Sequence, residues 1–165
     1  MKKAVLVGIA LLLFLCSCKK QVAFEVKKSG FSCDAEVQYN ETELKAKLFV
    51  GENGYFCAEV TEPEVIKGMK CEWSGDKVTV SYLGISKDID PDSIPYFNYA
   101  KLVRDILGGL SENVNAIAQK DTFVYNGTGK YGDYQIEFRA DGFPIKLELP
   151  SASLTVTFSN FQYVS

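Results

Sequence analysis

Cysteine offers most of the side-chain chemistry in this 165-residue chain, because the sequence contains no histidine. The absence of histidine excludes Ser-His-Asp and Cys-His nucleophile pairs, imidazole metal ligands and a histidine pH switch. The sequence also lacks a Gly-Lys-Ser/Thr phosphate loop, a Gly-x-Ser-x-Gly elbow and paired carboxylates at a convincing spacing. We therefore expect no enzyme activity, no catalytic residue and no cofactor. The five cysteines are Cys16, Cys18, Cys33, Cys57 and Cys71.

No metal site is expected either. Three cysteines in the body of the chain would have to converge from three strands, and no fourth ligand can be identified. The acidic residues Asp88, Asp90 and Asp92 are close enough in sequence to suggest calcium. Pro91 and Pro95, together with the missing later glutamate, argue against a calcium loop. A solvated turn is the favoured interpretation.

The N-terminus has the pattern of an export signal. Lys2 and Lys3 precede the run Ala4 to Leu15, which is apolar apart from one glycine. A helix of that length spans about 18 Å, whereas a membrane-crossing helix needs about 30 Å. A short apolar run behind basic residues at the extreme N-terminus is typical of a secretory signal.

The four residues Leu15-Cys16-Ser17-Cys18 resemble the bacterial lipobox. This resemblance implies cleavage after Ser17 and a diacylglycerol on Cys18, which would hold the protein at the extracytoplasmic face of the cell membrane. Cys16 is the alternative acceptor, but Leu15 is bulky for the small position before it. The other alternative is an uncleaved signal with incidental cysteines. The expected divisions are a signal peptide (1–17), a lipidated anchor with a short tether (18–21) and one domain (22–165).

Charge and length limit the partners of that domain. The formal charge is −3 at pH 7, and a mildly acidic chain argues against nucleic-acid binding. The length suits one domain, and we expect a monomer.

Alternating apolar residues predict a first hairpin from Phe31 to Val50. With a two-residue turn at Asn40-Glu41, Cys33 lies opposite Leu48, and every apolar side chain meets another. A slip of one residue would turn the whole apolar set to the other face.

Further strands and one helix follow along the chain. The Gly75-Asp76 turn places Trp73 opposite Val78, and the Asp141-Gly142 turn places Phe138 opposite Ile145 and, across the next strand, Phe158. Apolar residues recur at helical spacing from 96 to 108. A short second helical turn is expected near 112–118. The remaining expected strands are 22–26, 55–61, 69–73, 78–83, 122–125, 131–139, 145–149 and 154–158.

This pattern predicts a mainly β fold with one or two helices. About nine to ten strands at roughly 4.8 Å spacing form a sheet much wider than one helix, which is about 10 Å across. A flat sheet would leave a wide apolar face uncovered, so we expect a curled antiparallel sheet, an unclosed β-barrel, with a helix packed in its concave side.

Several segments are similar to the LolA-like superfamily, which includes lipoprotein-sorting and RseB-like periplasmic proteins. The similar segments are Phe31 to Val37, Gly54-Tyr55-Phe56 followed by Thr61-Glu62-Pro63, Trp73 to Val78, and Asp141-Gly142-Phe143-Pro144. The resemblance implies an unclosed barrel whose apolar concave side accepts acyl chains or lipidated proteins.

Two functions follow as hypotheses. The first is a membrane-anchored lipoprotein that binds a hydrophobic ligand, an acyl chain or lipidated peptide, inside the concave sheet, with a lipid or a lipoprotein as the possible partner. The alternative is a protein-interaction or sensor lipoprotein with a filled core. The candidate lining residues of the first hypothesis are Val37, Leu48, Trp73, Val80, Tyr82, Val103, Leu107, Phe138, Leu147 and Phe158.

A Cys57–Cys71 disulfide is one alternative for the cysteines. Both are equally far from the Pro63 turn region and could face each other across strands, and export supplies a compartment where disulfides persist. Pairing Leu48 with Ala58 would turn Cys57 to the opposite face, which leaves buried free thiols as the other alternative.

Overall fold

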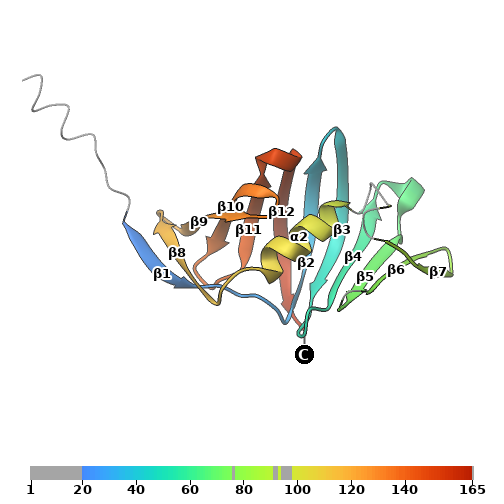
Figure 1. Cartoon of the computed structure of the whole chain (residues 1–165), viewed down its shortest axis with the longest axis horizontal. Coiled ribbons are helices and arrows are strands. Elements are labelled where there is room, and N and C mark those ends of the chain that lie inside the picture. The colour runs from blue at the N-terminus through green and yellow to red at the C-terminus, as the bar shows by residue number, and fades with distance from the viewer. Residues whose placement is uncertain (1–19, 76, 91–92, 94–97, 165) are drawn as a thin grey trace, which may run out of the picture.

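The computed structural model describes residues 20–164 except 76, 91, 92 and 94–97. In this part of the chain, twelve antiparallel strands form one sheet in the order β1-β8-β9-β10-β11-β12-β2-β3-β4-β5-β6-β7 (Figure 1). The strands are β1 (Gln21–Glu25), β2 (Phe31–Tyr39), β3 (Thr42–Val50), β4 (Phe56–Glu62), β5 (Lys70–Ser74), β6 (Lys77–Tyr82), β7 (Ile85–Asp88), β8 (Asn113–Ala118), β9 (Thr122–Gly129), β10 (Gly132–Arg139), β11 (Pro144–Leu149) and β12 (Leu154–Tyr163). One α-helix, α2 (Asn98–Gly108), and two short 3-10 turns, η1 (Glu64–Ile66) and η4 (Pro150–Ala152), complete the described elements. The two edge strands do not pair, so the curled sheet stays an unclosed barrel, as expected.

The first hairpin has the expected register. Cys33 pairs with Leu48, and Tyr39 pairs with Thr42 across the two-residue turn. Alternate residues of β2 and β3 are therefore buried on one face, while the lysines of β3 point to the other. The β5–β6 pairing of Trp73 with Val78 is also confirmed.

The C-terminal hairpin differs from the expectation at one end. A register shift between Glu137 and Phe138 pairs Phe138 with Pro144, so the expected pairing with Ile145 is wrong. A bulge places two residues of one strand against one of the other, and the alternation of polar and apolar residues in sequence does not reveal it.

Two strands were absent from the expected set. Residues 113–118 form β8 and not a helical turn, because Val114 and Ala116 alternate with exposed asparagines and β8 pairs along the whole of β1. β7 pairs with β6 at the opposite edge, and all four of its residues are exposed. These two strands raise the count from the expected nine or ten to twelve.

Helix α2 lies across the middle strands on the concave side of the sheet (Figure 1). Its apolar stripe of Tyr99, Val103, Ile106 and Leu107 is buried in the same cluster as the inward-facing residues of the strands. The described helix begins at Asn98, so the expected start at Tyr96 lies outside the described residues.

β12 joins the two halves of the sheet by pairing with β2, with Val156 opposite Val37. The chain thus places its C-terminal meander beside its N-terminal hairpin, and one continuous core runs beneath α2. Among the described residues, no helix has the length and apolar character to cross a membrane.

Candidate functional site: a groove at the end of the helix

The proposed lining residues lie in the packed core instead of around an open cavity. Eight of the ten have between 0% and 4% of their surface exposed, and Val80 and Tyr82 are half-buried. The eight are Val37, Leu48, Trp73, Val103, Leu107, Phe138, Leu147 and Phe158. The sequence therefore identified residues that share one face, and α2 fills the space that was expected to hold a ligand.

Asp105 attaches α2 to the C-terminal half of the sheet. Its carboxylate accepts a hydrogen bond from the Tyr131 hydroxyl at 2.6 Å and forms an ion pair with Lys130 at 2.7 Å. Lys101, one helical turn earlier, pairs with the same carboxylate at 3.2 Å. Since Tyr131 and Lys130 lie between β9 and β10, these contacts fix the helix against that hairpin.

Arg104 attaches α2 to the other half of the sheet. Its guanidinium donates to the backbone oxygen of Gly75, between β5 and β6, at 2.9 Å, and pairs with Asp105 at 3.2 Å. The helix is therefore held by polar contacts on both sides and by apolar packing beneath.

The Asp105 carboxyl is ionised at neutral pH. Burial alone would raise its pKa, but hydrogen bonds from Lys130, Tyr131 and Lys101 favour the ionised form and hold the pKa below its usual range. The ionised carboxylate therefore keeps these contacts in place at neutral pH.

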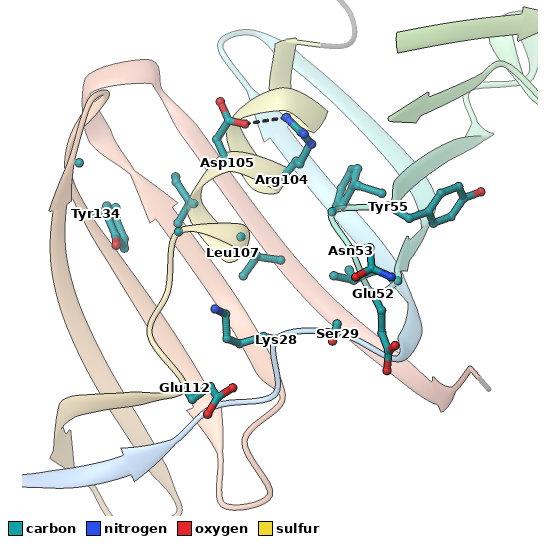
Figure 2. Close-up of a pocket in the computed structure, with 18 of the residues that line it drawn as sticks. Lys28, Ser29, Glu52, Asn53, Tyr55, Arg104, Asp105, Leu107, Glu112 and Tyr134 are labelled. Carbon is teal, nitrogen blue, oxygen red and sulfur yellow. Dashed lines mark hydrogen bonds and ion pairs between the residues drawn. The ribbon is translucent and has the colours of Figure 1, made fainter. Parts of the chain in front are cut away.

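A groove of about 920 Å³ opens beside the C-terminal end of α2. It lies between the helix end, the segment joining β1 to β2, the β3–β4 turn and the β9–β10 turn (Figure 2). Its floor contains Val50, Phe56 and Leu107, each with at most 8% of its surface exposed. Of the ten expected lining residues, Leu107 is the one that lines this groove. Its charged residues are Lys28, Glu52, Arg104, Asp105, Glu112 and Lys130.

Backbone hydrogen bonds fix the loops around the groove. Gly30 donates to Val50 at 2.7 Å, and Val26 donates to Glu112 at 2.9 Å. In the β3–β4 turn, Gly51 donates to Tyr55 at 3.0 Å, and the Tyr55 ring packs so closely that a Cβ on Gly51 would lie 3.0 Å from it. The Tyr55 side chain turns away from the groove (Figure 2), and its hydroxyl donates to Glu72 at 2.8 Å.

Tyr134 forms the wall of the groove on the β9–β10 side. A Cβ on Gly127 would lie 2.3 Å from the Tyr134 Cζ atom, so the ring sits directly against the backbone of β9. Tyr125 holds the ring from the side in an edge-to-face contact, with centroids 6.2 Å apart. A side chain at position 127 would therefore have to displace the Tyr134 ring.

Of the two alternatives for the cysteines, the structure has the buried free thiols and not the Cys57–Cys71 disulfide. Cys71 pairs with Ala58, whereas Cys57 pairs with Glu72, so the two side chains point to opposite faces of the sheet. Both residues and Cys33 are buried free thiols, and burial raises the pKa of each to about 12. They are therefore protonated and unreactive at neutral pH.

The described acidic residues that could have suggested a calcium site do not gather into one. Within the described ranges, no group of three or more acidic or cysteine side chains could hold a metal ion. Asp88 instead accepts a hydrogen bond from Thr79 at 2.8 Å, while Asp92 and the expected lipidation site, Cys18, lie outside the described residues.

Sequence reasoning missed the groove because its walls come from turns and helix ends. Its residues are scattered between positions 28 and 134 and share no periodic pattern. The one available signal was the spacing of Lys101 and Asp105, which places opposite charges one turn apart on the polar side of the helix.

Comparisons with known proteins give only distant structural likeness. No protein-family model and no curated protein matches the chain. Among solved structures, the chain is similar to one from the complex of the CwlD amidase with the GerS lipoprotein of Clostridioides difficile, with 18% identity, 99% of this chain and 96% of that chain covered, and a TM-score of 0.48.

Two other solved structures are similar to this chain at comparably low sequence identity. A LolA superfamily protein from Nitrosomonas europaea is 10% identical over 86% of this chain and 89% of that chain, with a TM-score of 0.45. A putative outer membrane lipoprotein-sorting protein domain from Vibrio parahaemolyticus is 11% identical over 84% and 87%, with a TM-score of 0.39.

Proposed function

We propose that this protein is a lipoprotein anchored through Cys18 at the extracytoplasmic face of the membrane, and that it binds a partner protein in the groove at the end of α2. The observation that carries the proposal is the contrast between the filled interior and the open groove. Side chains with 0–4% exposure occupy the interior, whereas the groove provides about 920 Å³ of accessible space.

The walls of the groove favour a polypeptide segment as the ligand. Charged residues of both signs line the groove. Lys28 and Lys130 are positive, and Glu52 and Glu112 are negative. A segment of a partner protein can match both signs, and its side chains can reach the apolar floor. Charged rims around a small apolar centre are characteristic of protein–protein interfaces.

A hydrophobic ligand is the second candidate, and the nature of the floor supports it. Val50, Phe56 and Leu107 belong to the core, so an acyl chain or a lipidated peptide that reached the floor of the groove would contact apolar side chains. Against this, binding of an acyl chain depends on the apolar area that leaves water, and these three side chains expose little.

The test is photo-crosslinking from the rim of the groove. A photoreactive residue replaces Glu112, whose side chain is exposed, in the full-length protein in its native membrane. The proposal predicts a protein adduct that disappears when Gly108→Trp fills the groove, since a Cβ on Gly108 meets nothing within 4 Å. Lys87→Trp places the same side chain on the exposed edge strand β7 and should leave the adduct unchanged.

Three other outcomes would contradict the groove as the binding site, the partner protein as the ligand, or the lipid anchor. A protein adduct that survives Gly108→Trp would show that the partner does not use the groove. Adducts to lipid alone, together with co-purified lipid in native mass spectrometry without detergent, would favour the hydrophobic ligand. The Cys18→Ser protein is expected either to be released from the membrane or to remain as an uncleaved precursor. Membrane retention of a correctly cleaved Cys18→Ser variant would refute the lipid anchor.

A further inference from the structure

The chain enters the described structure at one end of the molecule's long axis. Lys20 is exposed, and β1 begins at Gln21, which pairs with Ile117 near the end of β8. Figure 1 shows this edge at one end of the sheet and β7 at the opposite end. The described chain therefore begins beside the β8–β9 turn.

The β8–β9 turn is built as a compact, solvent-facing surface. Gln119 donates its backbone N–H to the oxygen of Thr122 at 2.8 Å, which closes the turn. Residues 118–121 are all exposed, and they include Lys120. Lys20 directly precedes β1, and Lys120 lies in the turn after β8, the strand that pairs with β1. Both lysines are exposed, and Asp121 is the acidic residue of the turn.

The distance from the proposed anchor is short. Two residues lie between Cys18 and Gln21. The three steps of an extended chain, at roughly 3.3–3.6 Å per residue, cover about 10 Å in total. With the sulfur of Cys18 held at the lipid headgroups, this edge cannot move far from the bilayer. Lysines next to a membrane are attracted to anionic lipids.

We propose that Lys20, Gln21 and the turn at residues 118–121 form the surface that faces the bilayer. The inference rests on the proposed lipid anchor and adds an orientation to it. β8 runs from Asn113, next to the groove residue Glu112, to Ala118 at this turn, so the groove lies at the end of the strand that is farther from the proposed membrane face. A partner protein would then approach from the side opposite the lipid.

The buried thiols make a direct test possible. Cys33, Cys57 and Cys71 are at most 1% exposed and protonated, so a single introduced cysteine can be labelled alone in the mature lipoprotein. Gln119→Cys carries a fluorophore at the proposed membrane face. Glu112→Cys is the matched control at the other end of β8, and Val65→Cys, at a position 75% exposed on η1, reports on the far end of the molecule.

The labelled lipoproteins are reconstituted into vesicles of phosphatidylethanolamine and phosphatidylglycerol that contain a headgroup nitroxide quencher. Flotation with the vesicles is measured first, and the proposal predicts several-fold stronger quenching at position 119 than at positions 112 and 65. Flotation with equal quenching at positions 119 and 65 would mean that the protein lies flat, and it would overturn this orientation alone. Flotation without quenching at position 119 would also overturn the orientation and leave the anchor standing. Loss of flotation would refute the anchor and the orientation together.

Discussion

At the scale of single residues, Asp105 makes the polar contacts that hold the helix to the sheet. Its side chain is 16% exposed and contacts three cations and a tyrosine hydroxyl. A carboxylate that is this well paired stabilises the fold only while it is ionised, so its contribution depends on pH.

Asp105→Asn should lower the free energy of unfolding by about 1–3 kcal/mol near neutral pH, the usual value of hydrogen bonds to a charged group. The folded pKa lies below the ordinary value, which is about 3.9 in an unfolded chain, so the contribution is present above that value and disappears as pH falls through the folded pKa. Denaturant unfolding at neutral and acid pH should show the wild-type advantage shrinking in acid. Asp121→Asn, an exposed control, should change stability by less than about 0.5 kcal/mol.

The buried cysteines give a second prediction at the residue scale. The mature protein should have three free thiols, from Cys33, Cys57 and Cys71, that a thiol reagent reaches only after unfolding, because burial keeps them protonated. Titration without reductant, before and after adding denaturant, measures this. Fewer than three thiols in the denatured protein would reveal the disulfide that the register of β4 and β5 disfavours.

At the scale of elements, the strands could be predicted where one face is buried along the whole length. The β2–β3 register followed from Cys33 and Leu48 because a slip would expose every apolar residue. β8 was missed because its inward residues, Val114 and Ala116, are few, small and separated by asparagines, and its pairing partner β1 lies far away in sequence. The exposed edge strand β7 has no buried face and therefore no apolar pattern.

The alternation of β12 gives the third prediction. Phe158 is 4% exposed and pairs with Ala35, whereas the neighbouring Thr157 is exposed. Phe158→Ala should cost on the order of 3–5 kcal/mol, as large truncations in a core do. Thr157→Ala should stay within roughly 0.5 kcal/mol. Equal losses in denaturant melts would mean that β12 presents both faces to similar surroundings.

The close approach of β9 and Tyr134 gives the fourth prediction. Gly127→Ala places a methyl group where the Tyr134 ring lies and should cost about 1–3 kcal/mol, typical of overpacking. In a Tyr134→Ala background the ring is gone, so the same substitution should be nearly neutral. A double-mutant cycle of unfolding free energies measures this coupling. If the losses in unfolding free energy of the two single variants simply add in the double variant, the strain caused by Gly127→Ala lies elsewhere in β9.

At the scale of the whole molecule, the curled sheet and its helix could be predicted, but not where the open space lies. The width of the sheet relative to one helix suggested an uncovered concavity. In the structure, large side chains such as Trp73 and Phe138 fill that concavity beneath α2, at 1% and 0% exposure. Side-chain volume is a property of the assembled core, and periodicity in the sequence reports only which face a residue joins.

The central claim is that the interior is filled and the groove is open, and two tryptophan substitutions on one helix test it most directly. Val103 is 1% exposed, so Val103→Trp should overpack the core and cost at least about 1–3 kcal/mol. Gly108 faces open space, so Gly108→Trp should cause no loss beyond about 0.5 kcal/mol. The measurement is the free energy of unfolding of the two variants beside the wild type. A Val103→Trp protein as stable as the wild type would contradict the account, because it would show that the space beneath α2 is open.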